Sequence, residues 1–163
     1  MILNASGCLD ALEAPEVARA LDVFVTKTVT PQRREGNRPV RIAETDAGML
    51  NSIGLENPGI DGLLRDKLPR LAELGVPLWV SVGGFAAADY AQLCAALDDR
   101  PEVAAIELNL SCPNVEEAPE STAELVAAGH GRLPGELRVG RELTNRLEHR
   151  LGAAREDLVT VCY

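Results

Sequence analysis

The stretch Val103–Asn109 reads Val-Ala-Ala-Ile-Glu-Leu-Asn, and residues 110–114 continue as Leu-Ser-Cys-Pro-Asn. A short, mostly apolar run of this kind is typical of a strand that is covered on both faces, as in a parallel sheet. The small and polar residues that follow end the run in a turn before Pro113. Ligands of parallel α/β folds bind at the carboxyl ends of the strands. The stretch therefore predicts a buried parallel strand that leads into a binding loop.

Similar runs recur along the chain, and helical patterns separate them. We expect strands over residues 2–5, 23–26, 77–82, 103–109 and 158–162, and helices over 11–21, 60–74, 86–97 and 136–151. Alternating strands and helices predict an α/β fold with right-handed crossovers. A complete eight-stranded barrel typically takes about 250 residues, whereas this chain has 163. Length alone therefore leaves two architectures open, a small open sheet and part of a barrel.

Composition and charge argue against several classes of partner. Sixteen Lys and Arg against 25 Asp and Glu give a net charge of −9, whereas nucleic acids and anionic membranes need a basic surface. No uncharged apolar stretch approaches the roughly 20 residues of a membrane-spanning helix. The four cysteines include no Cys-x-x-Cys pair, and both histidines are distant in sequence, so we expect no metal site. These features predict a cytoplasmic protein that binds neither nucleic acid nor membrane.

A long excursion between Thr28 and Gly59 interrupts the alternation of strands and helices. It is rich in Pro and Gly and is locally basic. A connection of this length without regular structure is usually functional in a compact domain. The excursion predicts either a loop that contributes to a binding site or a solvated surface loop.

Three residues near strand ends are candidates for chemistry. Lys27 directly follows an apolar run, so its ammonium either meets an anionic ligand or reaches solvent along its own stem. Asn109 either binds a ligand or satisfies loop backbone. Cys112 lies on the expected ligand side, where a thiol with an ordinary pKa of about 8.5 can act as a base or nucleophile. A loop cysteine without such a role is the other interpretation.

Several short strings resemble the soluble, FMN-dependent class 1 dihydroorotate dehydrogenases. The most specific is Glu-Leu-Asn-Leu-Ser-Cys-Pro-Asn-Val at 107–115, which resembles the active-site strand and loop of that family. Five others precede it in the chain, in the family's order. They are Asn-Ala-Ser-Gly at 4–7, Val-Thr-Lys-Thr at 25–28, Arg-Glu-Gly-Asn at 34–37, Ala-Glu-Thr at 43–45, and Gly-Met-Leu-Asn-Ser-Ile-Gly-Leu-Glu-Asn-Pro-Gly at 48–59. The resemblance covers about residues 2–128.

The resemblance implies the first four to five strand–helix units of a TIM (β/α)8 barrel, with residues 1–128 as a half barrel. It implies oxidation of dihydroorotate to orotate in pyrimidine biosynthesis, with hydride transfer to bound FMN. Cys112 would be the base that removes a proton from the substrate ring. The residues expected to bind the flavin are Ala5, Ser6, Lys27, Thr28 and Asn109. Those expected to bind the substrate are Lys27, Asn51, Ser52, Ile53, Gly54, Leu55, Asn109 and Asn114.

The remainder of the chain and the electron acceptor stay open. Residues 129–163 do not resemble the family's fifth strand, and we expect a tail with a helix and a short strand there. Relatives reduce either fumarate or a partner subunit that carries FAD and an iron–sulfur cluster; a homo-oligomer is also an expected partner state. The alternatives to a dihydroorotate dehydrogenase are a truncated, non-catalytic half barrel and a dihydropyrimidine dehydrogenase-like enzyme.

Overall fold

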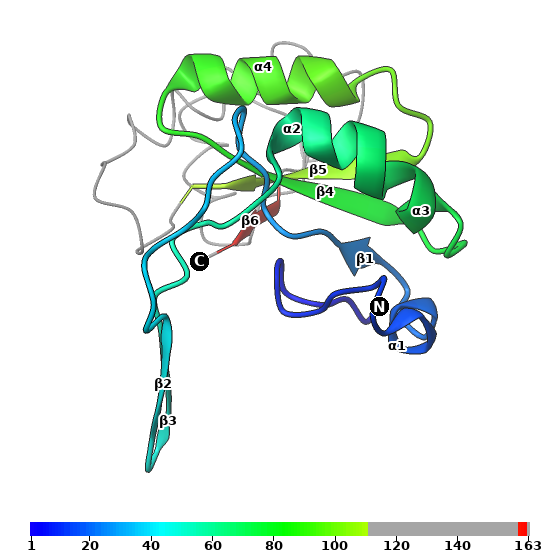
Figure 1. The fold of residues 1–163 in the computed structure, drawn as a ribbon. Coiled ribbons are helices and arrows are strands. Elements are labelled where there is room, and N and C mark those ends of the chain that lie inside the picture. Colours follow the sequence, from blue (N-terminus) through cyan, green and yellow to red (C-terminus); the bar gives the residue numbers. More distant parts are fainter. Residues whose placement is uncertain (111–159, 163) are drawn as a thin grey trace, which may run out of the picture.

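The computed structural model describes residues 1–110 and 160–162 of the chain (Figure 1). The helical segments in this part are α1 (Pro15–Arg19), α2 (Gly59–Gly62), the π-helical turn η1 (Leu63–Lys67), α3 (Leu68–Ala72) and α4 (Ala87–Leu97). The strands are β1 (Phe24–Val25), β2 (Ile42–Thr45), β3 (Gly48–Asn51), β4 (Leu78–Gly83), β5 (Val103–Asn109) and β6 (Thr160–Cys162). No helix among these residues is long and apolar enough to cross a membrane.

The main sheet is parallel and keeps the order of the chain. Its strands lie in the order β1-β4-β5-β6, and every pair is parallel. Strand β5 has the bounds predicted from the sequence, and the predicted strands at 23–26 and 77–82 are confirmed with shifts of one residue at their ends. Of the strand predicted over 158–162, the described residues 160–162 form β6. Among the described residues, α2, η1 and α3 lie between β1 and β4, and α4 lies between β4 and β5. Parallel neighbours in chain order with helical crossovers are typical of a (β/α) barrel.

The first predicted strand, residues 2–5, forms only a single bridge, from Leu3 to Val23. The Asn4 side chain takes the place of the missing ladder. Its Nδ2 donates to the Val25 carbonyl at 2.8 Å, and its Oδ1 accepts from the Val25 amide at 2.9 Å. A side-chain amide has the same donor and acceptor pair as a peptide group. The segment therefore joins the sheet edge through one backbone bridge and the Asn4 side chain, and the expectation of a regular strand is wrong here.

Strand β1 is shorter than predicted because a bulge follows it. The Thr26 amide donates to Trp79 O and the Val29 amide to Ser81 O, each at 2.9 Å. Between these two bonds the β1 side has one residue more than β4. An extra residue of this kind interrupts the alternation of side chains and redirects them, and such bulges often lie beside active sites. Lys27 and Thr28 are the residues inside this bulge.

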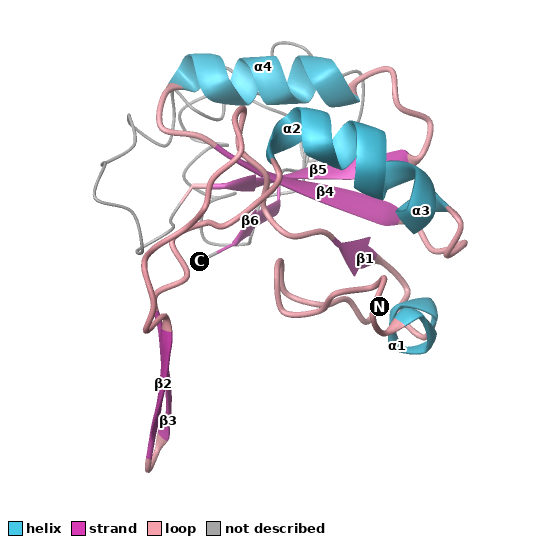
Figure 2. Ribbon diagram, viewed as in Figure 1, coloured by secondary structure: helices cyan, strands magenta, loops and turns pink. Residues whose placement is uncertain are grey.

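Helices cover one face of the sheet, as Figure 2 shows for α2, α3 and α4. The larger apolar core lies between these helices and the sheet and includes Val80, Val82, Leu93 and Leu108. A second, smaller cluster on the opposite face contains Val23, Val25 and Trp79, with Ala105 packed against it. In a barrel the face without helices is the interior. We refer to this face as the inner face.

The helix predicted over 60–74 is present from Gly59 to Ala72, but η1 interrupts it. Pro69 lies at the second position of α3 and has no N–H to donate to the carbonyl four residues earlier. The chain relieves this conflict by widening the preceding turn into the π-helical η1. The smooth apolar period of the sequence did not reveal the interruption.

The excursion between Thr28 and Gly59 contains regular structure, contrary to the sequence interpretation. Strands β2 and β3 form an antiparallel hairpin with Ile42 opposite Asn51. The hairpin projects from the body of the molecule (Figure 1), and all eight of its strand residues are exposed. Apolar side chains on it are open to solvent, with Met49 60% and Leu50 66% exposed.

Candidate functional site

A chain of hydrogen bonds joins the carboxyl ends of three strand segments on the inner face. Thr28 Oγ1 lies 2.9 Å from Ser81 Oγ, and Asn109 Nδ2 donates to Thr28 Oγ1 at 3.1 Å. The three residues come from the end of β1, from β4 and from β5. Thr28 and Ser81 are at most 2% exposed. The structure therefore brings together two of the predicted site residues, Thr28 and Asn109, and adds Ser81 on the other side of Thr28.

Small residues make this close approach possible. A Cβ atom at Gly83, the last residue of β4, would lie 2.9 Å from Thr28 Cγ2. Gly83 pairs with Asn109 in the ladder, so it lies between Thr28 and Asn109. The Thr28 methyl group occupies the space that a side chain at Gly83 would fill, and this lets Thr28 approach Asn109 closely.

Lys27 passes directly over Gly7 in the loop after Asn4. A Cβ at Gly7 would lie 2.8 Å from Lys27 Cδ and 3.0 Å from Lys27 Nζ, and Gly7 has a φ of +78°. The turn is closed by a bond from the Cys8 amide to the Ala5 carbonyl at 3.1 Å. The predicted flavin residues Ala5 and Ser6 belong to this turn. The structure thus places three of the predicted cofactor residues beside one another.

The predicted substrate residues Asn51–Leu55 lie at the base of the β2–β3 hairpin. Asn51 Oδ1 accepts from the Ile53 amide at 3.0 Å, and Asn37 Nδ2 donates to Ser52 Oγ at 3.0 Å. Leu55 is 7% exposed and has a φ of +54°. The segment is thus held by its own loop and by Asn37, in a conformation that includes two consecutive residues with positive φ, Gly54 and Leu55.

Asn57 organises the excursion and was not singled out from the sequence. Its Oδ1 accepts from the backbone amides of Thr30 at 3.1 Å and Gly59 at 2.8 Å. Its Nδ2 donates to the Leu55 carbonyl at 2.7 Å and to Thr30 Oγ1 at 3.0 Å. The side chain is buried, and it joins the beginning of the excursion to its end. Only the Asn-Pro-Gly string at 57–59, a common turn signal, could have pointed to it.

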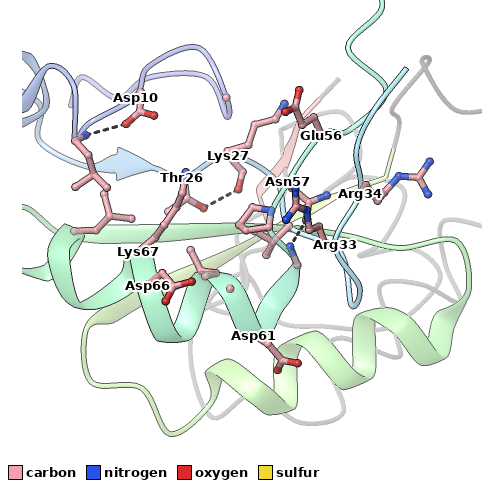
Figure 3. Close-up of a pocket in the computed structure, with 18 of the residues that line it drawn as sticks. Asp10, Thr26, Lys27, Arg33, Arg34, Glu56, Asn57, Asp61, Asp66 and Lys67 are labelled. Carbon is pink, nitrogen blue, oxygen red and sulfur yellow. Dashed lines mark hydrogen bonds between the residues drawn. The ribbon is translucent and has the colours of Figure 1, made fainter. Parts of the chain in front are cut away.

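An open cavity of about 810 Å³ lies between the N-terminal loop, the excursion and the α2–η1 helix. Its lining mixes acids and bases, and Figure 3 shows Asp61 and Asp66 on the helix and Arg33 and Arg34 on the excursion. Among the predicted site residues it includes Lys27 and Ile53 but neither Thr28 nor Asn109. The Lys27 side chain extends away from the α2–η1 helix in this view (Figure 3). The cavity therefore lies beside the inner-face cluster and does not contain it.

Of the cysteines that the structure describes, Cys94 is buried and Cys8 is exposed. Burial raises the pKa of the Cys94 thiol to about 11, with a smaller contribution from Asp98. Cys94 is therefore neutral and inert at physiological pH, whereas Cys8 is exposed. Cys112 and Asn114, the predicted base and one predicted substrate residue, lie outside the described residues. Within residues 1–110 and 160–162, no three His, Cys, Asp or Glu side chains gather as a metal site.

These features define the class of protein. A parallel sheet in chain order with helices on one face, and polar side chains gathered at the carboxyl strand ends, is the arrangement of part of a (β/α) barrel. The chain superposes on a crystal structure of DHODH from Eimeria tenella in complex with ferulenol with a TM-score of 0.62. That match has 19% identity and covers 93% of this chain and 42% of the other, and it supports a shared fold.

Residues 1–127 match the family model described as dihydroorotate dehydrogenase, and the chain belongs to that family. A relative from Desulforudis audaxviator is 50% identical over 117 residues, which cover 70% of this chain and 38% of the relative. One from Cutibacterium acnes is 40% identical over 136 residues, covering 79% and 44%. Both are named dihydroorotate dehydrogenase B (NAD(+)), catalytic subunit. The class 1 resemblance is confirmed, and the chain spans less than half the length of these relatives.

Proposed function

We propose that this chain acts in the oxidation of dihydroorotate to orotate, with FMN bound on the inner face. The observation that carries the proposal is the Thr28–Asn109 hydrogen bond of 3.1 Å. It brings two predicted ligand residues from distant parts of the chain to one point, beside the bulge that presents Lys27. The chain's membership of the dihydroorotate dehydrogenase family supports the same function. So does the contact between Thr28 and Asn109, which come from two of the strings that resemble that family.

The residues present fit a flavin. A flavin ring is flat and rich in carbonyl and ring-nitrogen acceptors, and it needs donors around a floor without bulky side chains. The end of β4 at Gly83, which has no side chain, and the turn at Ala5 and Ser6 supply such a floor. Lys27 and Asn109 supply an ammonium and a carboxamide at its edge. When bound, the flavin accepts the hydride that leaves the substrate ring.

The chain's own groups bind the substrate and take its proton. Lys27 places a positive charge where the carboxylate of dihydroorotate binds, and a charged pair of this kind orients a flat anion. Asn109 and Asn114, with the segment 51–55, donate to the ring carbonyls. Cys112 removes the proton from the ring carbon adjacent to the one that loses hydride, so that a carbon–carbon double bond forms.

The relatives' names favour a partner subunit as the electron acceptor. Relatives of this chain are called catalytic subunits of NAD(+)-type enzymes, which places them in a complex. We propose that a partner subunit with FAD and an iron–sulfur cluster takes the electrons from this site. Fumarate should then fail to reoxidise the substrate-reduced chain; rapid reoxidation by fumarate would contradict this assignment.

The proposed function is tested by ligand titration of the purified 163-residue chain. FMN fluorescence should quench and saturate at one flavin per chain, and orotate should then bind to the loaded chain more tightly than uracil. Absence of saturable FMN binding would overturn the proposal. Tighter binding of uracil than of orotate would instead favour a dihydropyrimidine dehydrogenase-like site.

The chain offers a matched control, because it has only two lysines, Lys27 and Lys67. Lys27→Ala should weaken orotate binding by roughly 10- to 100-fold, the value of a lost charged hydrogen bond. Lys67→Ala removes the same charge from η1, and it should leave orotate binding unchanged. Equal effects of the two substitutions would show that only net charge matters and would refute the role of Lys27.

A further inference from the structure

Tyr90 connects helix α4 to the carboxyl ends of β4 and β5, which α4 covers (Figure 1). Its hydroxyl donates to the Asn109 carbonyl at 2.6 Å and lies 3.2 Å from the Gly84 carbonyl. The side chain is 1% exposed and packs in the larger core. The hydroxyl thus reaches from the outer, helix-covered face to the point where β5 leaves the sheet.

Asn109 is therefore held from both faces of the sheet. On the inner face its Nδ2 donates to Thr28 Oγ1, and Thr28 is in turn bonded to Ser81. On the outer face its carbonyl accepts from Tyr90. The inner bond fixes the direction of the carboxamide, because the nitrogen faces Thr28. The outer bond fixes the position of the Asn109 backbone, from which that carboxamide extends.

We propose that Tyr90 is a positioning residue for Asn109, and that it sets the affinity for the anionic pyrimidine ligand without touching it. The inference rests on the proposed function for the identity of the ligand. A carboxamide recognises a ring carbonyl only if its position is fixed within about half an ångström. The Tyr90 hydroxyl supplies this restraint at the last residue of β5, where the ladder itself ends.

The arrangement of α4 supports a rigid role for Tyr90. Asp89, the preceding residue, accepts hydrogen bonds from the amides of Phe85 at 2.9 Å and Ala86 at 3.2 Å. A carboxylate in the first turn that binds the incoming backbone fixes where the helix begins. Because these bonds fix the start of α4, they also fix the position from which the Tyr90 hydroxyl reaches the Asn109 carbonyl.

The first test uses the ligand-free chain, so that its result does not depend on the proposed function. The Asn109 side-chain amide protons are observed by NMR in the native chain and in Tyr90→Phe. We expect the two Nδ2 proton resonances to be dispersed and slow to exchange in the native chain. In Tyr90→Phe they should move toward the averaged values of a free carboxamide. Unchanged Asn109 resonances in a folded Tyr90→Phe chain would overturn the inference.

The second test is a double-mutant cycle with orotate on the FMN-loaded chain. Tyr90→Phe should raise the orotate dissociation constant about three- to tenfold, the range of one hydrogen bond. In an Asn109→Ala background the same substitution should have no further effect, because the carboxamide that Tyr90 positions is absent. A merely structural role would give additive effects in both backgrounds, and that result would refute positioning through Asn109.

The outcomes distinguish this inference from the proposed function. A native chain that binds no orotate contradicts the proposed function, while the NMR comparison still decides whether Tyr90 positions Asn109. If Tyr90→Phe does not fold, 3-fluorotyrosine in place of both tyrosines alters the same hydroxyl without removing it. The Asn109 resonances must then shift, and their constancy would overturn the inference.

Discussion

Replacing Asn57 with Ala should remove the hydrogen bonds that join the two ends of the excursion, and so lower the free energy of unfolding of the chain substantially. The side chain makes four hydrogen bonds within the protein, three of them to backbone groups of Thr30, Leu55 and Gly59. Thr30 Oγ1 has one proton, which the 2.6 Å bond to Gln32 O uses, so the hydroxyl accepts from Asn57 Nδ2. Alanine can replace none of these contacts.

The magnitude follows from what the substitution leaves behind. The amides of Thr30 and Gly59 lose their acceptor in a buried environment, and an unsatisfied buried donor costs about 1–3 kcal/mol. Two such donors and two lost acceptor contacts sum to a loss of about 3–5 kcal/mol in the free energy of unfolding. For a chain of this length that loss lowers the melting temperature by roughly 10 °C.

Asn51→Ala is the matched control. It removes the same side chain from the same excursion, but Asn51 is exposed and accepts a single bond, from the Ile53 amide. Water replaces that bond, so we expect a loss under about 0.5 kcal/mol. Urea unfolding of the native chain and the two variants measures the difference. A loss below about 1 kcal/mol for Asn57→Ala, or equal losses for both, would refute the reasoning.

Three further predictions concern glycines and a cysteine. Gly54→Ala forces a φ of +75° on alanine and places its Cβ 2.7 Å from a facing backbone nitrogen, so urea unfolding should show a loss of about 2–4 kcal/mol. Gly48→Ala, with nothing within 4 Å, should stay within about 0.5 kcal/mol of the native chain. Gly7→Val should displace Lys27 and strain the turn at Ala5 and Ser6, so the titration should show weaker binding of both FMN and orotate; unchanged affinity for both would contradict this. Folding raises the pKa of Cys94 from 9.0 to about 11. The buried thiol therefore adds up to about 3 kcal/mol to the free energy of unfolding below pH 9, and this contribution is lost as the pH rises to 11. Unfolding midpoints measured across this range should decline less in Cys94→Ala than in the native chain.

The sequence was informative wherever burial alone determines structure. The apolar run at Val103–Asn109 predicted β5 with its observed bounds, because a strand covered on both faces excludes polar residues along most of its length. Parallel strands bring their carboxyl ends to one edge, and the structure places Thr28, Ser81 and Asn109 together there. Thr28 and Asn109, predicted as ligand residues, are in direct contact.

The features that were missed depend on contacts between distant segments. The bulge at Lys27 and Thr28 leaves no trace in the periodicity, because it is defined only by which β4 carbonyl each amide reaches. Asn4 and Asn57 resemble ordinary loop residues in the sequence, and their roles follow from partners about twenty or more positions away. Tyr90 follows the apolar period of α4, so only its hydroxyl contact with Asn109 distinguishes it from a core residue.

The most direct test of the account is a single-turnover reduction. The FMN-loaded chain is mixed with dihydroorotate without oxygen, and the loss of flavin absorbance is followed in the native chain and in Cys112→Ala. The account predicts that the native chain loses its flavin absorbance, whereas Cys112→Ala binds flavin and orotate but is not reduced at a comparable rate. Bound flavin that dihydroorotate leaves oxidised, or equal reduction rates in the two chains, would contradict the assignment of this site to dihydroorotate oxidation.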